Sequence, residues 1–382
     1  MLRYFTAGET HGKCLTVIIE GVPAGAEISL DKINEALAER QKGYGRGGRM
    51  LIEKDTAEIL SGIRGGISLG SPIAMRIENR DWKNWQDIMG TEESNGKKRV
   101  EFPRPGHADL IGGMKYDHRD LRNVLERASA RETAARVAVG ALAKQLVEPF
   151  GIKFMSRVIS IGEVTDTSDI TEPGFYDRAA QSPVRFGDEA AAKRAMEYID
   201  KVKAAGESCG GVVEVRAAGV PAGLGSYVQY DRKLDARLAF AAMSVQAIKG
   251  VEIGMGFEAS RRSGSQVHDE IFYENGSFVR KTNNAGGIEG GMSNGEPIVL
   301  RAAMKPIPTQ YNPLRTVSID DKRPHEASVE RSDACAVPAC AVVMEAVTAY
   351  EIVNAFLEKF GGDCMADIKA SYKAYIDRIK NF

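Results

Sequence analysis

Residues 8–25 of the chain read GETHGKCLTVIIEGVPAG, and residues 206–223 read GESCGGVVEVRAAGVPAG. At this single offset nine of the 18 positions are identical, and Thr10 in the first copy corresponds to Ser208 in the second. Self-similarity at a constant offset is the signature of a repeated structural unit. The two stretches therefore predict that the chain of 382 residues folds as two similar halves.

Both copies continue in the same way along the chain. A strand-like stretch, at 15–19 and at 212–215, leads to a Pro-Ala-Gly turn. A helical pattern follows the turn, at about 30–41 and at about 232–246. Each half is thus predicted to open with a strand, a turn and a helix.

Two further echoes keep the same order in both halves. Residues 111–114 resemble residues 289–292 around a shared Gly-Gly-Met, and residues 126–130 resemble residues 330–334 around a shared Glu-Arg. Chance similarity among glycine-rich turns is the alternative explanation. The common order of three echoes argues against it.

The helical segments at 133–147 and 339–360 carry little charge. A helix that is apolar on most of its surface is buried, and sheets on both sides would bury it. We therefore expect an α+β fold, a β-α-β sandwich of two internally duplicated halves with buried helices between the sheets. The chain would form a single domain, 1–382, with halves at about 1–151 and 206–365 and an insert at 152–205.

Charge and cysteine content narrow the classes of function. Lys plus Arg (51) nearly balance Asp plus Glu (52), which argues against nucleic acid as the main partner, because neutralising many phosphates needs a surplus of basic groups. No apolar run approaches the ~20 residues of a membrane helix, and no signal-peptide pattern is recognisable. The five cysteines are scattered without a CxxC spacing, so neither a disulfide framework nor a metal site is expected. We expect a cytoplasmic protein with no membrane partner.

His11 is the first candidate for catalysis, because the second copy of the duplicated turn has Cys209 at the same position. If the shared motif served only the turn, an imidazole would not be needed there. A structural histidine is the alternative, and it is the commoner role of a single histidine.

His107 is the second candidate and stands in the loop RPGHAD, close to Arg104. A histidine beside an arginine is electrostatically unfavourable unless an anion lies between them. Near a phosphate a histidine favours its protonated form and can act as a general acid.

Arginines gather in the run RQKGYGRGGR, which places Arg40 at a helix end and Arg46 and Arg49 in a glycine-rich loop. Guanidinium groups bind phosphate and carboxylate oxygens in a bidentate manner. The run therefore predicts an anion site. A mobile surface loop and a short RGG-like nucleic-acid segment are the alternatives.

The two apolar helices are preceded by polar segments. Ser129 can cap the first helix, whose free backbone N–H groups suit a phosphate. Asp333 stands at the corresponding point of the second helix, where helix capping is the simpler interpretation. The stretch 305–309, KPIPT, is stiffened by its prolines and points Lys and Thr at one region. No GxxxxGK[ST] is present and no GxGxxG follows a strand, so neither a P-loop nor a Rossmann site is predicted.

Taken together, these segments resemble the chorismate synthase family. Three family signatures are recognisable, at residues 8–23, 127–141 and 331–347. The motifs RQxGYGRGxRM, RPGHAD, GGxxGGxSNG and KPIPT fall between them in the family's order. The resemblance runs from residue 2 to about residue 365, with Thr10, Ala128 and Gln246 as departures from the residues that the family commonly has.

The resemblance implies a lyase of the shikimate pathway, in aromatic amino acid biosynthesis. The family converts 5-enolpyruvylshikimate 3-phosphate to chorismate by a 1,4-anti elimination of phosphate, and it requires reduced FMN although there is no net redox change. The resemblance also implies a homotetramer. Some members carry an NAD(P)H:flavin reductase activity, but no additional reductase domain is recognisable here, so we expect an external flavin reductase.

The resemblance further implies roles for individual residues. His11 would donate a proton at the leaving phosphate, His107 would protonate the reduced flavin or hold it neutral, and Asp333 would tune or deprotonate flavin N5. The substrate's phosphate and carboxylates would bind Arg40, Arg46, Arg49, Arg104 and Arg131. The flavin would contact Arg127, Ala128, Ser129, Gln246, Ala247, Gly290, Lys305, Pro306, Ile307, Pro308, Thr309 and Arg331, and no metal is expected.

Two functions from other classes stay open at this point. One is a flavin-independent, phosphate-handling transferase. The other is a nucleic-acid binder that uses the Gly/Arg loop.

Overall fold

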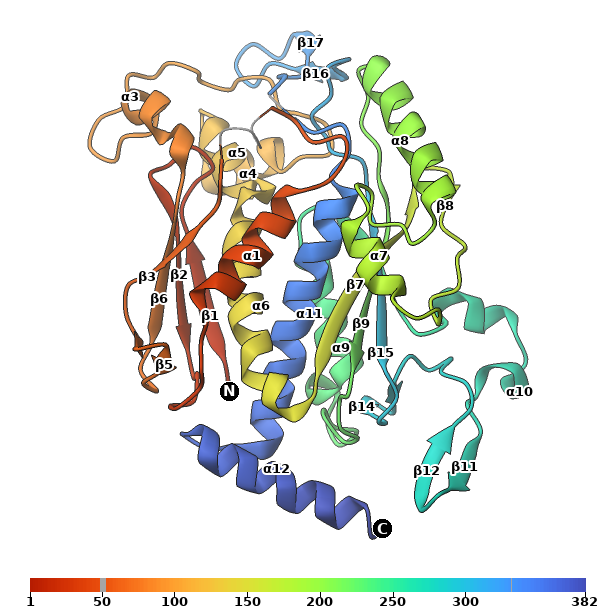
Figure 1. The fold of residues 1–382 in the computed structure, drawn as a ribbon. Helices are drawn as coiled ribbons and strands as arrows, with labels where there is room; N and C mark the ends of the chain where they lie inside the picture. Colours follow the sequence, from red (N-terminus) through yellow and green to blue (C-terminus); the bar gives the residue numbers. More distant parts are fainter. Residues whose placement is uncertain (49–52, 331) are drawn as a thin grey trace.

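Two antiparallel β-sheets enclose a layer of helices in the computed structural model, which describes residues 1–48, 53–330 and 332–382 (Figure 1). The four-stranded sheet has the order β1 (Arg3–Ala7), β2 (Cys14–Glu20), β6 (Ile73–Glu78) and β3 (Ala57–Ile59). The five-stranded sheet has the order β10 (Ile248–Ile253), β15 (Ile298–Met304), β9 (Gly211–Ala218), β7 (Lys153–Ile161) and β8 (Val164–Thr165). Between them lie α1 (Leu30–Gln41), α6 (Thr133–Val147), α9 (Leu234–Met243) and α11 (Val337–Phe360). The predicted α+β sandwich with buried helices is confirmed.

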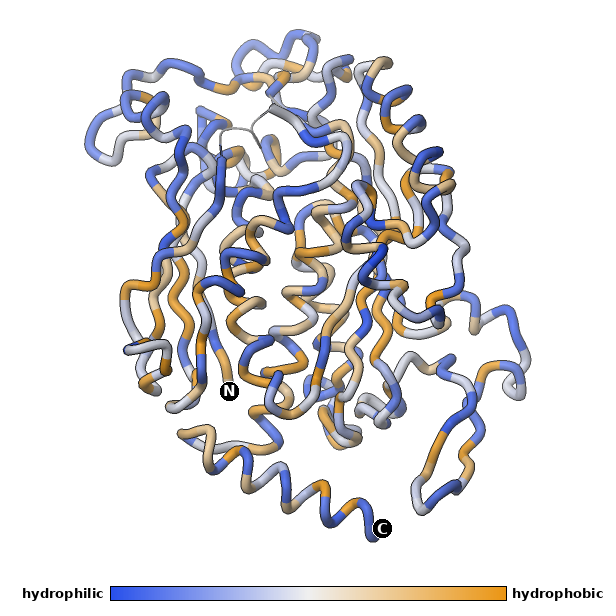
Figure 2. Tube along the Cα trace, viewed as in Figure 1, coloured by the Kyte–Doolittle hydropathy of each residue, from blue (hydrophilic) through white to orange (hydrophobic). Residues whose placement is uncertain are grey.

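Further elements surround this core. They are β4 (Ile63–Arg64), β5 (Ile67–Ser68), α3 (Gln86–Met89), α4 (Asp109–Tyr116), α5 (Arg122–Ala128), α7 (Phe175–Gln181), α8 (Glu189–Ala204), α10 (Gly264–Val267), β11 (Ile271–Glu274), β12 (Ser277–Arg280), β13 (Ile288–Glu289), β14 (Met292–Ser293), β16 (Arg315–Val317), β17 (Pro324–Glu326) and α12 (Met365–Ile379). Figure 2 shows the apolar segments gathered in the strands and helices of the core, with hydrophilic segments in the loops around it.

Alternation along the strands fixes which face of each sheet meets the helices. In β2 the side chains of Leu15, Val17 and Ile19 are buried, whereas Ile18 and Glu20 between and after them are exposed. Because successive side chains in a strand point to opposite faces, the buried set lines the helical layer. The other face of this sheet is turned away from the helices.

The two long helices α6 and α11 lie against each other in the centre of the layer. Gly140 permits this close approach, since a Cβ built there would lie 2.5 Å from the Cα of Ala346. The prediction for 133–147 is confirmed at both ends, and α11 begins two residues earlier than predicted, with Pro338 in its first turn. Pro is favoured there because its missing N–H would have no helical partner.

The duplication is visible in the strand pairing. In each half the strand of the repeated motif pairs antiparallel with a strand of its sheet that comes earlier in the chain, β2 with β1 and β9 with β7. In each half a short hairpin is also hydrogen-bonded to the Pro-Ala-Gly turn. Ser68 in the β4–β5 hairpin donates to the carbonyl of Pro23 at 2.6 Å, and Ser293 at the β13–β14 hairpin donates to Pro221 at 2.6 Å.

This hairpin correspondence corrects one of the predicted echoes. Residues 289–292 surround the turn between β13 and β14, whereas residues 111–114 lie inside the helix α4. The pairing of these two segments was therefore wrong. The structural counterpart of 289–292 is 64–67, which reads RGGI and forms the β4–β5 turn.

The boundaries of the two halves stay a prediction. Lys153–Ile161, within the predicted insert 152–205, takes the place in its sheet that β1 takes in the other. We propose on this ground that the second half begins at β7, and that the inserted part is reduced to the region of α7 and α8.

The helix α11 is long and apolar enough to cross a membrane by length and composition, which the sequence analysis had not expected of any segment. In the structure 83% of its most apolar window is buried inside the protein. Its apolar surface is therefore covered by the sheets and helices around it.

Candidate active site

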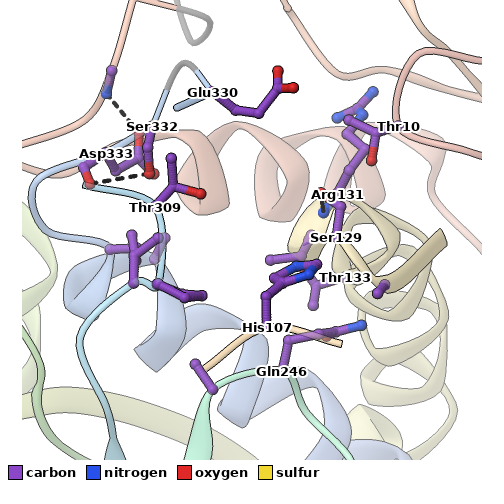
Figure 3. Close-up of a pocket in the computed structure, with 18 of the residues that line it drawn as sticks. Thr10, His107, Ser129, Arg131, Thr133, Gln246, Thr309, Glu330, Ser332 and Asp333 are labelled. Carbon is purple, nitrogen blue, oxygen red and sulfur yellow. Dashed lines mark hydrogen bonds between the residues drawn. The ribbon is translucent and has the colours of Figure 1, made fainter. Parts of the chain in front are cut away.

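A cavity of about 410 Å³ opens where α6 and α11 begin, and both halves of the chain line it. Figure 3 shows Arg131, Ser129 and Thr133 from the first half on one side. On the other side lie Asp333 and Thr309 from the second half. Converging polar groups in a concave site of this size are typical of small-molecule sites.

His11 lies at the cavity, 7% exposed, and is held by Glu126 in α5. Its ring atom Nδ1 is 2.8 Å from Glu126 Oε1, and its backbone N–H donates to Glu126 Oε2 at 2.8 Å. Burial raises the pKa of Glu126, but the hydrogen bonds from His11 and the charge of Arg122 outweigh burial, so that the pKa is lowered. A glutamate anion and an imidazole thus form a buried pair at the cavity.

His107 is held in a similar way by Asp109, the first residue of α4. Its Nδ1 is 2.6 Å from Asp109 Oδ1. Arg104 donates to the same carboxylate from Nε at 2.8 Å and to the Thr309 hydroxyl from Nη1 at 2.7 Å. Burial would raise the pKa of Asp109, but the hydrogen bonds of His107 and Arg104 together lower it far below its ordinary value.

Arg40 and Arg131 converge on one buried carboxylate, Asp55. Arg131 Nη1 lies 2.7 Å from both oxygens of Asp55, and Arg40 Nη1 lies 3.4 Å from one of them. Burial lowers the pKa of Arg40 to about 10, so Arg40 is still protonated at neutral pH. Arg131 Nη2 is buried without a hydrogen-bond partner among the described residues. The same nitrogen lies 4.0 Å from Glu53 Oε2, within ion-pair distance.

Asp333 lies four residues before the first residue of α11 and does not cap it, since the N-cap is Ala336 without a side-chain hydrogen bond. The interpretation as a helix cap was wrong. The Asp333 carboxylate instead accepts the backbone N–H of Gly47 at 2.6 Å and pairs with Arg46 Nε at 3.2 Å. It ties the arginine-rich loop of the first half to the second half at the cavity wall.

Ser129 caps a single 3-10 turn, Ala130–Glu132, that leads into α6. Its hydroxyl accepts the backbone N–H of Arg131 at 3.3 Å. The predicted capping role is confirmed, one turn before α6 itself. This turn brings Ala128, Ser129 and Arg131 to the cavity.

The wall from the second half is largely apolar. It consists of Val245, Met304, Ile307, Pro308, Ala336, Ala339, Cys340 and Val343. Gln246 and Ala247 lie beside it, and Ala247 has the unusual backbone angle φ +70°. Gln246 Oε1 is buried without a hydrogen-bond partner among the described residues. Lys305 Nζ donates to the carbonyl of Gly106 in the RPGHAD loop.

The structure brings most of the predicted site residues to this cavity, although lining a cavity does not test their roles. The lining includes His11, Arg40, Arg46, Arg104, His107, Ala128, Ser129, Arg131, Gln246, Ala247, Lys305, Ile307, Pro308, Thr309 and Asp333. Arg49 and Arg331 lie outside the described residues.

Three predicted contacts do not line the cavity. Arg127 donates to the carbonyls of Gly8 and Thr6 at 3.0 and 2.9 Å. Gly290 lies in the turn between β13 and β14, and Pro306 is flanked by lining residues without being one of them.

Four residues at or behind the site were not predicted from the sequence: Trp85, Asp55, Asp109 and Glu126. Asp109 had a local signal, because it follows His107 by two positions in RPGHAD. Glu126 belongs to the third echo but is 115 residues from His11, and nothing in the sequence pairs the two. Trp85 and Asp55 had no signal.

Comparison with known proteins places this geometry in a family. The family model described as "Chorismate synthase" matches residues 2–357. Proteins named chorismate synthase from Geobacter metallireducens and Aquifex aeolicus are 57% and 55% identical, and each alignment covers 100% of this chain and at least 99% of the relative. A solved structure titled "Crystal Structure of Chorismate Synthase" aligns with a TM-score of 0.81 and 48% identity, and covers 100% of this chain and 99% of the other.

Proposed function

Because the chain belongs to the chorismate synthase family, we propose that it converts 5-enolpyruvylshikimate 3-phosphate to chorismate by 1,4-anti elimination of phosphate, with reduced FMN bound and no net redox change. The observation that carries this proposal is the meeting of two carboxylate-held histidines and four arginines at one cavity. Neither the transferase nor the nucleic-acid binder is favoured by the family of the chain.

The substrate brings a phosphate and two carboxylates, and the arginines suit these anions. Arg40 and Arg131 are fixed by Asp55, and Arg104 is fixed by Asp109, so their donors are oriented before a ligand arrives. Fixed donors cost no reorganisation when negative charge develops on the leaving phosphate. A substrate oxygen would give Arg131 Nη2 a hydrogen bond, which this nitrogen makes to none of the described residues.

His11 would supply the proton for the leaving phosphate. The Glu126 carboxylate lies 2.8 Å from Nδ1 and would balance a positive charge on the ring while the other ring nitrogen gives its proton to the departing phosphate. General-acid assistance of this kind contributes about 10²- to 10⁴-fold to rate. The neighbouring arginines would hold the phosphate within reach.

The residues at the cavity fit a reduced flavin. The apolar wall of the second half suits a planar ring system, and the buried Gln246 Oε1 would accept a hydrogen bond from a ring N–H. Lys305 and Thr309 would meet the cofactor phosphate, as would Ser129 at the start of the 3-10 turn. The chemistry that reduced FMN would supply there is a transient donation of electron density to the substrate.

His107 and Asp333 would face this cofactor from opposite walls. His107 Nδ1 lies 2.6 Å from Asp109 Oδ1 and 3.0 Å from Arg104 Nη2, so Nε2 is the ring atom left to hold or deliver a proton in the cavity. Asp333, fixed by Gly47 and Arg46, would accept a proton on the other side.

The wider setting follows from the same family. We propose a homotetramer in the cytoplasm that obtains reduced flavin from an external reductase. The five cysteines are free thiols, which suits a reducing compartment.

An anaerobic assay tests the proposal. Purified protein is mixed with 5-enolpyruvylshikimate 3-phosphate and dithionite-reduced FMN, and chorismate is measured. We expect chorismate to form with reduced FMN and not with oxidised FMN. Folded protein that forms none would overturn the proposal, and product formed without flavin would favour the transferase.

A further inference from the structure

We propose that Glu126 is a positioning residue, which fixes the orientation and tautomer of His11 so that Nε2 is the atom that serves the cavity. This inference rests on the proposed function, because it assumes that His11 acts on a ligand there. Glu126 itself would not touch the ligand, and it would act through His11.

Glu126 holds the His11 turn by four hydrogen bonds. The two oxygens of its carboxylate accept hydrogen bonds from the ring Nδ1 and from the backbone N–H of His11, each at 2.8 Å. Its backbone carbonyl accepts the backbone N–H of Thr10 at 3.0 Å and the Thr10 hydroxyl at 2.9 Å. One residue of α5 thus fixes both the backbone and the ring at the place where the histidine meets the cavity.

The charge of Glu126 determines which ring nitrogen carries hydrogen. The side chain is fully buried beside Arg122, whose Nη1 is 3.3 Å from Oε1. An ionised carboxylate can only accept hydrogen bonds. His11 Nδ1 must therefore carry a hydrogen, so the proton that the ring delivers to the cavity is the one on Nε2, the nitrogen turned away from Glu126.

Trp85 fixes the plane of the same ring. The two rings stack at 3.7 Å between centroids with an angle of 15° between planes. Trp85 is itself held, because its Nε1 donates to Asp81 at 3.2 Å and Lys98 Nζ lies 3.8 Å from its ring centroid. Glu126 and Trp85 together leave His11 little freedom to turn or tilt.

The second half shows what the turn requires without a histidine. There Cys209 replaces His11, and its backbone N–H donates to the carbonyl of Ala334 at 2.9 Å. Glu330, the sequence counterpart of Glu126, instead pairs with Arg122 at 2.9 Å. The turn folds without a glutamate carboxylate behind it, so the carboxylate of Glu126 serves the imidazole.

Two substitutions separate a positioning role from a merely structural one. Glu126→Gln keeps the length and a hydrogen-bond acceptor but removes the charge, whereas Glu126→Asp keeps the charge and shortens the side chain. An orienting group behind a histidine is worth from about 10-fold to about 10⁴-fold in rate. We expect Glu126→Gln to lower kcat by about 100-fold with little change in KM, and Glu126→Asp to be the milder variant. A kcat for Glu126→Gln within about 2-fold of the wild type, or a milder effect of Gln than of Asp, would overturn the proposal.

Trp85 reports on the ring without any turnover. The chain has two tryptophans, so Trp82→Phe leaves Trp85 as the single emitter. In this background His11→Ala gives the emission of a Trp85 that no imidazole contacts, because contact with an imidazole changes the emission of an indole. We expect Glu126→Gln to move the emission at least halfway towards that limit. Emission unchanged from the parent would contradict the proposal, even if the wild type forms no chorismate and the proposed function fails.

Glu214→Gln is the matched control. Glu214 is equally buried and is paired with Arg157 and Arg301 at 2.9 and 3.1 Å, but it lies in β9 away from the cavity. We expect this variant to lose stability while the Trp85 emission and kcat stay close to the parent values. An equal loss of kcat in both variants would show that any buried glutamate pair produces the effect, and the proposal would fall.

Discussion

Asp109→Asn is the substitution whose cost can be worked out most directly from the structure. The Asp109 side chain is fully buried and accepts hydrogen bonds from His107 Nδ1 at 2.6 Å and from three nitrogens of Arg104 between 2.8 and 3.1 Å. Removing one partner of a buried ion pair costs about 3–5 kcal/mol, because the remaining charge is left uncompensated. Asparagine keeps one acceptor oxygen, so we expect the free energy of unfolding to fall by about 3 kcal/mol, the lower end of this range.

The same carboxylate predicts an acid dependence of stability. The pKa of Asp109 is lowered in the folded protein, so the unfolded chain binds its proton more readily. The stability contributed by this group is therefore fully present above the unfolded pKa of about 3.9 and is lost as the pH falls below it. The asparagine variant lacks this group, and its free energy of unfolding should fall less steeply below about pH 4.

Urea denaturation at fixed protein concentration, at pH 7 and in steps down to pH 3, measures both effects. Asp320→Asn is the matched control, because Asp320 also forms a bidentate pair with an arginine, Arg99, at 2.7 and 2.9 Å, but on the surface. We expect the control to change little. An Asp109→Asn protein within about 1 kcal/mol of the wild type at pH 7, with the same acid slope, would refute this reasoning.

Three further substitutions test other parts of the account. His11→Ala should fold, as Cys209 shows that the turn tolerates another residue, and should lose about 10²- to 10⁴-fold in kcat; an unfolded variant by circular dichroism would make His11 structural. Asp333→Asn should lower kcat more than the affinity for FMN measured by fluorescence titration, and unchanged turnover would remove Asp333 from the chemistry. Gly140→Ala should lower the free energy of unfolding by about 1–3 kcal/mol, because its Cβ meets the backbone of α11 at 2.5 Å, and an equally stable variant would show that the two helices can separate freely.

Local signals in the sequence predicted the elements of the fold well. The helix at 30–41 is bounded by Ser29, whose hydroxyl accepts the backbone N–H of Lys32, and its limits were predicted to the residue. The apolar helix at 133–147 was equally clear, because little of its surface is polar. Such signals come from residues that are neighbours in the sequence, so they can be recognised without knowledge of the tertiary structure.

Pairings between distant segments were harder to predict. The echo of 289–292 was assigned to 111–114 because both contain Gly-Gly-Met, although one forms a hairpin turn and the other a helix. A glycine pair occurs in both elements here, so the pair alone does not distinguish a hairpin turn from a helix. Likewise β7 carries no trace of the repeated motif, and its place beside β9 depends on sheet hydrogen bonds.

The candidate site also contains residues that local motifs reveal and residues that only the folded chain brings together. His11, His107 and the arginines stand in motifs and could be named from the sequence. Their partners could not, with the exception of Asp109, because Glu126 and Asp55 become neighbours of these residues only when the chain is folded. These partners determine which ring nitrogen or guanidinium donor is presented to a ligand.

The central claim is that the cavity catalyses an elimination that needs reduced FMN but consumes no electrons. The most direct test follows chorismate, inorganic phosphate and the absorbance of the flavin in one anaerobic reaction with limiting reduced FMN. We expect chorismate and phosphate in equal amounts, many turnovers for each FMN, and flavin still reduced at the end. Flavin oxidised in proportion to the product formed would contradict the central claim.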